Sequence, residues 1–346
     1  MSFSKNLLPG SPYNGYSDAD MLYLSSNQKW PDSGYAPWAS WEAENSSFGR
    51  TIREWASYPA FFPICAVSDH AVHWESRCWP NEVDSAFDLY LTWNSKKADK
   101  MRLHDKHVLH IPHPWISYRK KHYVPSKSER FGTLVYFPHS NDLSTPTFDS
   151  LDAYILSLRQ LPAEFHPLVI CVSFHDVRKG LCDILRPYGF PLVTAGCTQS
   201  RFFVDRFYSL ARNFRYTTSP NIGSHSFYLA EAGIPFFLYG TEPTYILKGS
   251  SAVPDGELNL LDYGDEEDIQ RLMELRRLFS DPCDEVTNQQ IEAVSYYMGA
   301  DAGTTPELLC SALWQSLKEN IRPVSGLYLK LSKSLIGSAV RTLKIK

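Results

Sequence analysis

Small and hydrogen-bonding side chains follow five successive apolar runs in the second half of the chain. They come directly after each run: His139, Ser140 and Asn141; His175 and Asp176; Gly196, Cys197 and Thr198; residues 219–224; and Gly240, Thr241 and Glu242. Parallel α/β sheets bind ligands beyond the carboxyl ends of their strands. If these runs are parallel strands, the polar groups converge on one edge of a sheet and form a ligand site there.

The segment 217–240, TTSPNIGSHSFYLAEAGIPFFLYG, is the richest of these strand ends. Gly223 and Ser224 begin a predicted helix, and the free N–H groups at a helix start can hold a phosphate. Ser224 and Ser226 add hydroxyl donors, and Glu231 lies about two helical turns further along. The alternative is an ordinary helix on which a serine is only the N-cap.

A candidate general base follows an apolar run of the first half, in the segment SDHAVHWES at 68–76. Asp69 can orient His70 or act as the base itself, with His73 and Glu75 as further candidates. Histidine is favoured because its ordinary pKa lies close to neutral pH. In the alternative interpretation Asp69 caps a turn and the histidines make only local hydrogen bonds.

The elements that must position these residues are clearest after residue 131. Five predicted strands (132–138, 167–174, 191–195, 214–218 and 235–240) alternate with four predicted helices (148–161, 176–189, 200–213 and 224–233). This alternation predicts a doubly wound parallel sheet with right-handed crossovers. Three more helices are expected at 265–280, 285–298 and 305–319.

The first half is less regular, with a predicted helix at about 41–57 and buried strands at 61–68, 88–94 and 107–111. A charged stretch at 118–130 is the expected linker. Next to it, His113, Arg119, Lys120 and Lys121 either face an anionic ligand or are simply exposed. Because 346 residues exceed one ordinary core, we expect an N-terminal α/β domain at 1–125, a second domain at 126–320 and a tail at 321–346.

The composition is that of a soluble globular chain, with 43% hydrophobic and 21% charged residues. A net charge of -4 argues against a nucleic-acid partner. The seven cysteines form no C-x-x-C pair, which argues against a disulfide framework or a zinc site and favours the cytoplasm. No secretory signal and no stretch of about 18 apolar residues is evident.

The C-terminal segment is basic and amphipathic. Residues 320–346 contain six basic side chains and no acidic one, and 324–346 carries apolar residues at helical spacing. Such a helix is typical of binding to an anionic membrane surface. The alternative is a terminal helix that packs on the body of the protein.

Several nucleotide and hydrolase motifs are absent: G-x-G-x-x-G, the P-loop, H-E-x-x-H and G-x-S-x-G. Instead, the series Gly223-Ser224, Glu231-Ala232 and Gly233-Ile234-Pro235 before a strand resembles the donor-nucleotide motif of GT-B glycosyltransferases. The related non-hydrolysing UDP-sugar 2-epimerases have the same pattern. The resemblance covers about 131–320 by motif and the first half by architecture. It is greatest to enzymes of bacterial capsule or lipopolysaccharide assembly.

This resemblance implies two Rossmann-like domains that face each other across a cleft, followed by C-terminal helices. It also implies an inverting, metal-independent transfer of sugar from a nucleotide sugar, with no other cofactor, to a glycan or lipid-linked acceptor at the inner face of the plasma membrane. The implied donor-binding residues are His139, Ser140, Asn141, His175, Ser219, Gly223, Ser224, His225 and Glu231. The expected catalytic residues are Asp69, His70 and Glu75.

Two rival hypotheses remain open. An epimerase acts on the free nucleotide sugar, but in that family an Asp precedes Ser-Gly-Gly, whereas Pro220, Asn221 and Ile222 stand here. A protein that binds the nucleotide sugar without catalysis is the second rival, because a fold does not determine a function.

Overall fold

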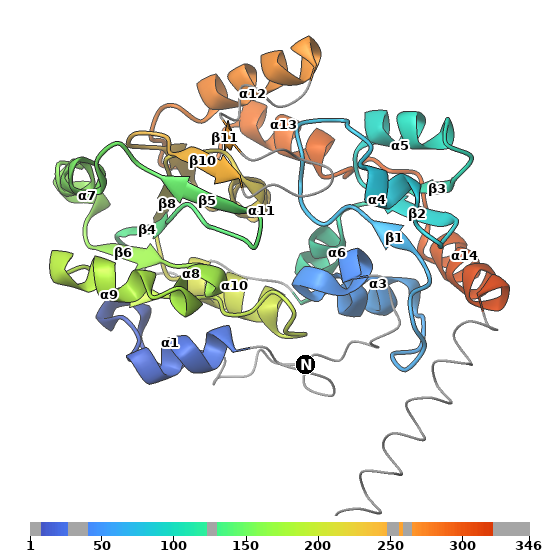
Figure 1. Ribbon diagram of the computed structural model, residues 1–346, viewed down its shortest axis with the longest axis horizontal. Helices are drawn as coiled ribbons and strands as arrows, with labels where there is room; N and C mark the ends of the chain where they lie inside the picture. The colour runs from blue at the N-terminus through green and yellow to red at the C-terminus, as the bar shows by residue number, and fades with distance from the viewer. Residues whose placement is uncertain (1–7, 27–40, 123–129, 248–255, 259–264, 321–346) are drawn as a thin grey trace, which may run out of the picture.

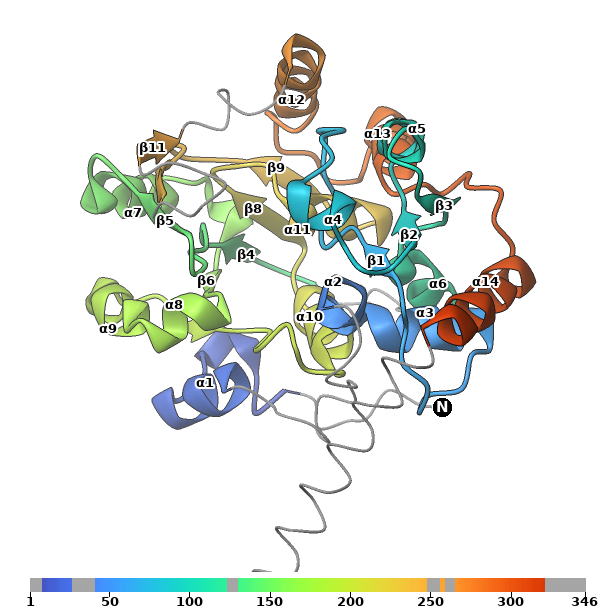
Figure 2. The same cartoon turned by 45° about the vertical axis from the view of Figure 1, so that its right-hand side comes forward.

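The computed structural model describes residues 8–26, 41–122, 130–247, 256–258 and 265–320 (Figure 1). These residues form an α/β protein with two parallel sheets and a small antiparallel sheet. The predicted α/β class with parallel sheets is therefore confirmed. Helices cover the sheets, and the two parallel sheets lie in separate halves of the ribbon (Figures 1 and 2).

The larger parallel sheet has the strand order β7-β6-β4-β8-β9. Its strands are β4 (Thr133–Tyr136), β6 (Leu168–Cys171), β7 (Leu192–Val193), β8 (Tyr216–Ser219) and β9 (Phe236–Leu238). Each lies within or at the edge of a predicted strand. The chain first adds strands on one side of β4 and then returns to add β8 and β9 on the other side. The strand order therefore reverses between β4 and β8, where doubly wound sheets have their ligand crevice.

The helices between these strands are α7 (Leu151–Arg159), α8 (Phe174–Arg178), α9 (Leu181–Leu185), α10 (Phe203–Ala211) and α11 (Ser224–Glu231). The single helix predicted at 176–189 is wrong, because the chain breaks at Gly180 with φ +83°. Few residues other than glycine adopt this left-handed conformation. The helix also starts earlier than predicted, because the Ser173 side chain accepts a hydrogen bond from the His175 amide and caps α8.

The smaller parallel sheet has the order β1-β2-β3 and consists of β1 (Val67–Ser68), β2 (Leu89–Thr92) and β3 (His107–His110). The strand predicted at 61–68 is mostly wrong, since only its last two residues pair with β2. Pro63 has no N–H for a strand ladder. Short α4 (Pro80–Val83) and α5 (Ser95–Arg102), both missed by the sequence pattern, connect the strands.

The helix predicted at 41–57 is broken into α2 (Trp41–Glu44), a 3-10 turn and α3 (Phe48–Ala56). The break lies at Ser46 and Ser47, whose φ angles of +51° and +63° are left-handed. The linker predicted at 118–130 is also wrong in its first part. Helix α6 (Pro114–His122) continues through it, because Tyr118 is buried and lies 6.2 Å from Tyr208 of α10, ring to ring.

The antiparallel sheet is the element that the sequence pattern missed entirely. It joins β5 (Ser144–Thr147), β10 (Thr244–Leu247) and β11 (Gly256–Leu258) in the order β11-β10-β5. Strand β5 is Ser-Thr-Pro-Thr and has no apolar run, and the apolar run of β10, Tyr245 to Leu247, is shorter than the runs that identify buried strands. The sheet stands beside the carboxyl ends of β4 and β8 and contributes Tyr245 to that region.

Each parallel sheet is completed by a segment from the other end of the chain. Helix α1 (Asp18–Ser25), not predicted, packs against α8, and Met21 and Leu24 join the core of the larger sheet. Helix α14 (Pro306–Glu319) packs against α3 and β2 of the smaller sheet, where Ser316 donates to the Cys65 carbonyl. Helices α12 (Glu266–Leu278) and α13 (Asn288–Tyr297) lie between them in sequence, and all three predicted C-terminal helices are confirmed.

One apolar cluster contains residues of both halves. Trp93 and Trp115 of the first half and Tyr228 of α11 belong to a single buried cluster. The Trp115 and Tyr228 rings are 4.1 Å apart. Burying a side chain of this size stabilises the fold by about 2–3 kcal/mol, so the halves are joined by an apolar seam.

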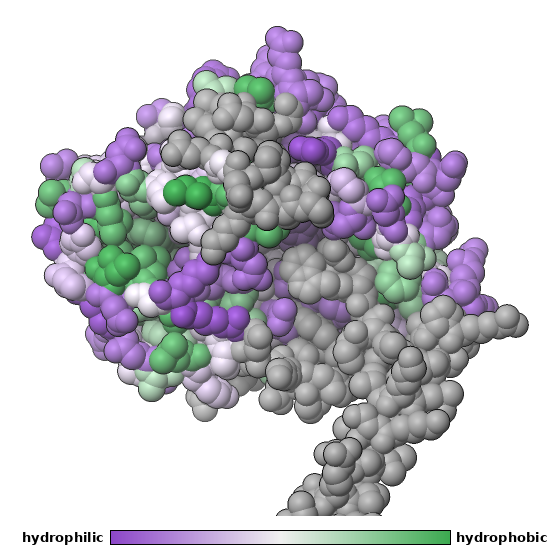
Figure 3. Space-filling view, viewed as in Figure 1, coloured by the Kyte–Doolittle hydropathy of each residue, from purple (hydrophilic) through white to green (hydrophobic). Residues whose placement is uncertain are grey.

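The face shown in Figure 3 is mainly hydrophilic, with separate apolar areas. The large apolar side chains that are exposed, such as Leu22, Leu156 and Met273, come from different helices. Within the described ranges, no helix has the length and apolar character needed to cross a membrane. The basic tail at 324–346 lies outside the described residues.

Candidate functional site

The ends of β4 and β8, neighbours in the sheet, bring two of the predicted sets of polar residues together. Strand β4 leads into His139 and Ser140, and β8 ends at Ser219 and leads into the turn before α11. The His225 ring of α11 stacks on Tyr136 at the end of β4, with centroids 5.0 Å apart and an angle of 19°. The loops after β4 and β8 therefore both border the place where the strand order reverses and a ligand crevice is expected.

The turn at 219–223 leaves the start of α11 without a side-chain cap. Gly223 is the N-cap, in extended conformation, and in the part of the chain that the structure describes no side chain caps the helix, although the Ser226 amide donates to the Gly223 carbonyl at 2.9 Å. Ser224 is the first helical residue, so the alternative of a serine N-cap is wrong. Uncapped amides together with the helix dipole suit an anion.

Hydrogen bonds hold the turn itself. The Ser219 hydroxyl donates to Asn221 Oδ1 at 3.0 Å, and Asn221 Nδ2 donates to the Tyr245 hydroxyl at 2.9 Å. The Ser226 hydroxyl donates to the Gly223 carbonyl at 2.6 Å. Ser219 and Ser226 thus shape the turn, and Tyr245 of β10 is a site neighbour that the sequence pattern did not identify.

The loop after β4 is fixed by α8 and the residue that follows it. The buried Ser140 amide donates to the Asp176 carboxylate at 3.0 and 3.2 Å. Lys179 Nζ donates to Ser140 Oγ and to the Asn141 carbonyl, both at 2.8 Å. The Asn141 side chain accepts from the amides of Leu143 and Ser144 and forms the turn into β5, which is a structural role.

Three histidines gather at this edge, where His139 is exposed and His175 and His225 are half-buried. Burial lowers the pKa of His225 to about 3, and the nearby His139 adds to this effect. Burial also lowers the pKa of His175, although Asp142 at 3.9 Å opposes it. His225 is therefore neutral at pH 7, and an anion bound here would raise both pKa values.

The loop that follows β1 reaches the start of α11. The Val72 amide donates to Ser224 Oγ at 3.0 Å. On its other side the loop is held by the end of β2: Trp93 Nε1 donates to the Ala71 carbonyl at 3.0 Å, and Asn94 Nδ2 to the Glu75 carbonyl at 3.1 Å. The structure therefore brings the predicted base segment, 68–76, into contact with the predicted phosphate helix.

Asp69 is held in a buried ion-pair network. Its carboxylate accepts hydrogen bonds from Tyr90 at 2.7 Å and Thr92 at 2.5 Å, and Lys97 Nζ lies 2.7 Å away. Lys97 also pairs with Glu82 at 2.8 Å. Burial opposes ionisation, but Lys97 and the Thr92 hydroxyl hold the pKa of Asp69 below its ordinary value. Because three donors occupy this carboxylate, Asp69 is placed to orient the loop rather than to take up a proton.

Glu75, unlike Asp69, is buried without a full set of hydrogen-bond partners. It is 6% exposed; His73 Nδ1 lies 3.5 Å from its Oε1, and its Oε2 is buried with no hydrogen-bond partner in the described part of the chain. Burial raises the pKa of Glu75 to about 7, with Asp268 adding to this effect and Lys97 opposing it. A carboxyl group with this pKa can give or accept a proton at neutral pH.

His73 lies next to this carboxyl group, and the His70 ring is 5.2 Å from the His73 ring. Burial lowers the pKa of His73 to about 3, with His70 and Lys97 adding to the effect, so His73 is neutral and a weak base. Of Asp69, His70 and Glu75, Glu75 is therefore the carboxyl group whose pKa lies near neutral pH, and His70 lies beside His73.

Glu231 lies at the far end of α11, about 10 Å along the axis from Ser224. Its carboxylate accepts from both sides of the Arg119 guanidinium, with Nε at 2.6 Å and Nη2 on the second oxygen. This pair joins α6 to α11 across the seam. The structure thus gives Glu231 and Arg119 each a partner other than a ligand, which the sequence pattern did not anticipate.

A D-x-D sequence, Asp18-Ala19-Asp20, lies at the start of α1. Asp18 pairs with Arg186, and Asp20 accepts a hydrogen bond from Ser17. Across the part of the chain that the structure describes, no three His, Cys, Asp or Glu side chains are grouped closely enough to hold a metal ion.

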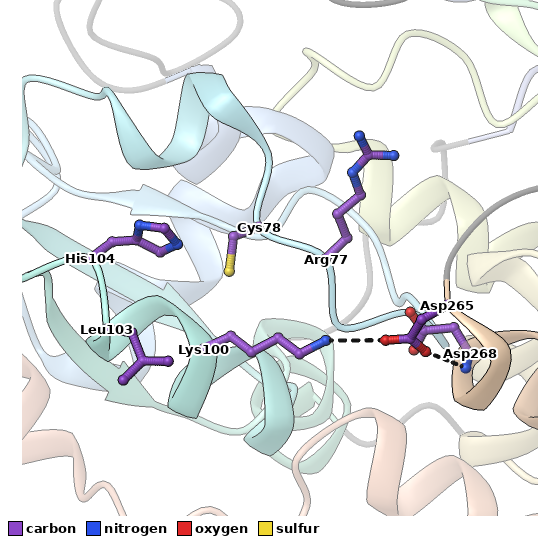
Figure 4. Close-up of a pocket in the computed structure, with 7 residues that line it drawn as sticks. All are labelled: Arg77, Cys78, Lys100, Leu103, His104, Asp265 and Asp268. Atoms are coloured by element: carbon purple, nitrogen blue, oxygen red, sulfur yellow. Dashed lines mark hydrogen bonds and ion pairs between the residues drawn. The ribbon is translucent and has the colours of Figure 1, made fainter.

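A hollow of about 590 Å³ lies beside the base segment, between α5 and α12 (Figure 4). It does not include the turn at 219–223. Its lining comes from three segments: Arg77, Cys78, Lys100, Leu103, His104, Asp265 and Asp268.

Comparison with known proteins found no matching family model, no matching curated protein and no matching solved structure.

Proposed function

We propose that this protein is a glycosyltransferase that moves a sugar from a nucleotide sugar to a surface-polysaccharide acceptor. One observation carries the proposal: the turn at the strand-order reversal begins α11, and Ser224 of that helix contacts Val72 in the loop that holds His70, His73 and Glu75. The proposed phosphate site and the proposed proton-transfer site thus belong to segments in contact, which supports transfer of a sugar from a nucleotide.

On the donor side, the first amides of α11 and the Ser224 hydroxyl bind the phosphate next to the sugar. Ser224 Oγ accepts from the Val72 amide, and the Ser224 side chain also forms a hydrogen bond with Tyr228, so the amides of α11 are the main donors to the phosphate. Lys179 adds positive charge at the opposite loop. Groups that stabilise the negative charge of the departing phosphate are the main requirement of such a transfer, and these do so without a metal ion.

On the acceptor side, Glu75 takes the proton of the acceptor hydroxyl while that oxygen forms the new bond to the anomeric carbon. The bond between this carbon and the phosphate oxygen breaks, and the nucleotide leaves with the bonding electron pair. Attack from the face opposite the phosphate inverts the anomeric centre. Asp69 keeps the loop in place through Tyr90, Thr92 and Lys97.

The proposal includes a GT-B-like arrangement in which the smaller sheet belongs to the acceptor domain and the larger sheet to the donor domain. The active-site opening then lies at the rim of the apolar seam, where the loop after β1 meets α11. A lipid-linked acceptor and a position at the inner face of the plasma membrane, through the basic tail, complete the proposal.

Calorimetry of the full chain with UDP, GDP and CMP tests the donor site. We expect one nucleotide to bind, and Ser224→Ala and Lys179→Ala each to raise its Kd about tenfold. Lys106→Ala is the control, because Lys106 also bonds two loop carbonyls but precedes β3, at the opposite edge of the other sheet. The proposal is overturned if none of the three nucleotides binds, or if both variants bind as the parent does.

A further inference from the structure

The chain between α3 and β1 forms a tight turn that presents a phenylalanine at the surface. The Phe62 amide donates to the Pro59 carbonyl at 3.2 Å, which places Ala60 and Phe61 at the tip of the turn. Phe61 is 69% exposed, and its ring centroid lies 4.5 Å from that of Phe62. In both views of the ribbon this segment lies beside α14 (Figures 1 and 2).

Hydrogen bonds from buried side chains hold the base of this turn. Arg53 of α3 donates from Nε and Nη2 to the Phe62 carbonyl, at 3.1 and 3.0 Å. The Tyr58 hydroxyl donates to the Pro63 carbonyl at 3.1 Å. Because the turn is fixed at its base, the position of Phe61 at the surface is built into the fold. Exposing a large apolar ring to water is unfavourable, and such a ring is stabilised when a binding partner covers it.

Helices α3, α6 and α14 meet beside this turn. At the end of α6, Lys121 Nζ and His122 Nε2 lie 3.7 and 3.1 Å from Glu54 Oε2, in the last turn of α3. Trp314, in the second half of α14, packs against Phe62 with ring centroids 4.8 Å apart. The C-terminal ends of α3 and α6 and the second half of α14 are therefore neighbours.

Among the described residues, the exposed charges at these helix ends are mainly basic. They lie in the last turns of α6 and α14 and include Lys120, Lys121 and Lys318. Of the acidic groups here, Glu54 is paired with α6, and Glu319 accepts from Gln315 at 3.0 Å. Residues 320–346, which follow α14, contain six basic side chains and no acidic one. An apolar tip with basic side chains around it is complementary to an anionic membrane.

We propose that the turn at 59–62 is a membrane-docking point, at which Phe61 enters an anionic bilayer while Lys120 and Lys318 contact the lipid headgroups. The inference rests on the membrane position in the proposed function and adds a second contact to that of the tail. One weak attachment gives only marginal membrane binding, whereas an apolar anchor together with a basic segment holds a protein in place. A second copy of the chain is disfavoured as the partner, because a symmetric contact would bring the same lysines face to face.

Co-sedimentation of the full chain with vesicles tests the proposal. The parent should bind vesicles of phosphatidylcholine with phosphatidylserine more tightly than vesicles of phosphatidylcholine alone. Phe61→Ala should lower the partition coefficient about tenfold, because the ring no longer enters the bilayer. Phe61→Trp should bind as the parent does, since tryptophan is favoured at the membrane interface. Lys120→Gln should lower binding about fivefold, and only to the vesicles that contain phosphatidylserine.

Tyr23→Ala is the matched control, because Tyr23 is an aromatic residue of similar exposure, 70%, on α1 of the other half. It should bind vesicles as the parent does. Urea unfolding of Phe61→Ala should match that of the parent, which shows that a change in binding is not a loss of fold. The proposal is overturned if Phe61→Ala and Tyr23→Ala bind vesicles alike. It is also overturned if the parent self-associates without lipid and Phe61→Ala does not.

The same experiment separates this inference from the proposed function. If the parent sediments with the anionic vesicles and Phe61→Ala sediments equally, the docking point is wrong while the membrane position stands. If the parent does not sediment, the docking point and the membrane position both fail. Calorimetry with UDP, GDP and CMP on the same preparations reports on the donor site independently of either result.

Discussion

Replacing Glu75 by Gln should make the protein more stable at neutral pH and remove its activity. The carboxyl group is buried, and its pKa of about 7 contrasts with an ordinary value of 4.5. Gln has a similar shape but does not ionise. The folded Glu75→Gln variant therefore avoids the cost of a buried negative charge, while it loses the group that we propose as the general base.

The pH dependence of the free energy of unfolding follows from proton binding by Glu75. Between pH 4.5 and about 7 the folded protein holds a proton on Glu75 that the unfolded chain has released, so Glu75 makes the fold less stable as the pH rises. Each pKa unit is worth about 1.4 kcal/mol, and the full gap corresponds to about 3 kcal/mol. Relative to wild type, Glu75→Gln should gain about 2–3 kcal/mol between pH 5 and pH 8.

Urea unfolding followed by tryptophan fluorescence at pH 5, 6, 7 and 8 measures this difference. Glu292→Gln is the control, because Glu292 is exposed on α13 and the same substitution there should give no pH-dependent gain. In the same preparations, Glu75→Gln should bind the nucleotide normally. If the wild-type and Glu75→Gln stabilities run parallel from pH 5 to pH 8, Glu75 does not retain its proton near neutral pH and the argument for it as the base fails.

Three further predictions concern other parts of the molecule. Lys97→Met leaves Asp69 and Glu82 buried without their shared cation and should cost about 3–5 kcal/mol in urea unfolding, whereas Lys96→Met, at an exposed pair with Glu267, should cost less than about 1 kcal/mol. Burial lowers the pKa of His113 from 6.5 to about 3, so up to about 5 kcal/mol of stability is lost as the pH falls between these values. In the His113→Asn variant the free energy of unfolding should depend less on pH over this range. An equal pH dependence in wild type and variant would contradict the argument. Deleting 324–346 should release the full chain from anionic liposomes in a sedimentation assay, and equal sedimentation would refute membrane binding by the tail.

The elements of the larger sheet were predictable because its strands are buried on both faces. Strands β4 and β6 contain buried runs of Leu, Val and Ile, which hydrophobicity identifies, whereas β8 is buried but consists of Tyr, Thr, Thr and Ser. The antiparallel sheet was not predictable in this way, since β5 has no apolar run and the run in β10 is only three residues long. The break at Ser46 and Ser47 was missed because serine is not a residue that predicts left-handed backbone.

The candidate site, too, was predictable from the sequence only in part. Polar residues after each predicted strand were correctly expected at the carboxyl edge of a parallel sheet, because all such strands end on the same side. The sequence alone therefore determined the edge and the residue types, including Ser140, Ser219 and Ser224. It did not determine that β4 and β8 are neighbours, since strand order depends on how the whole sheet assembles.

The tertiary structure also decided which acidic side chain is suited to proton transfer. Asp69 and Glu75 stand in the same short segment, and the sequence favoured Asp69 and the adjacent His70. In the fold, Asp69 pairs with Lys97 and accepts hydrogen bonds from Tyr90 and Thr92, whereas Glu75 is buried with one oxygen unpartnered among the described residues. The ionisation of a carboxyl group depends on burial and on charges brought close from distant positions in the chain, and only the folded structure determines these.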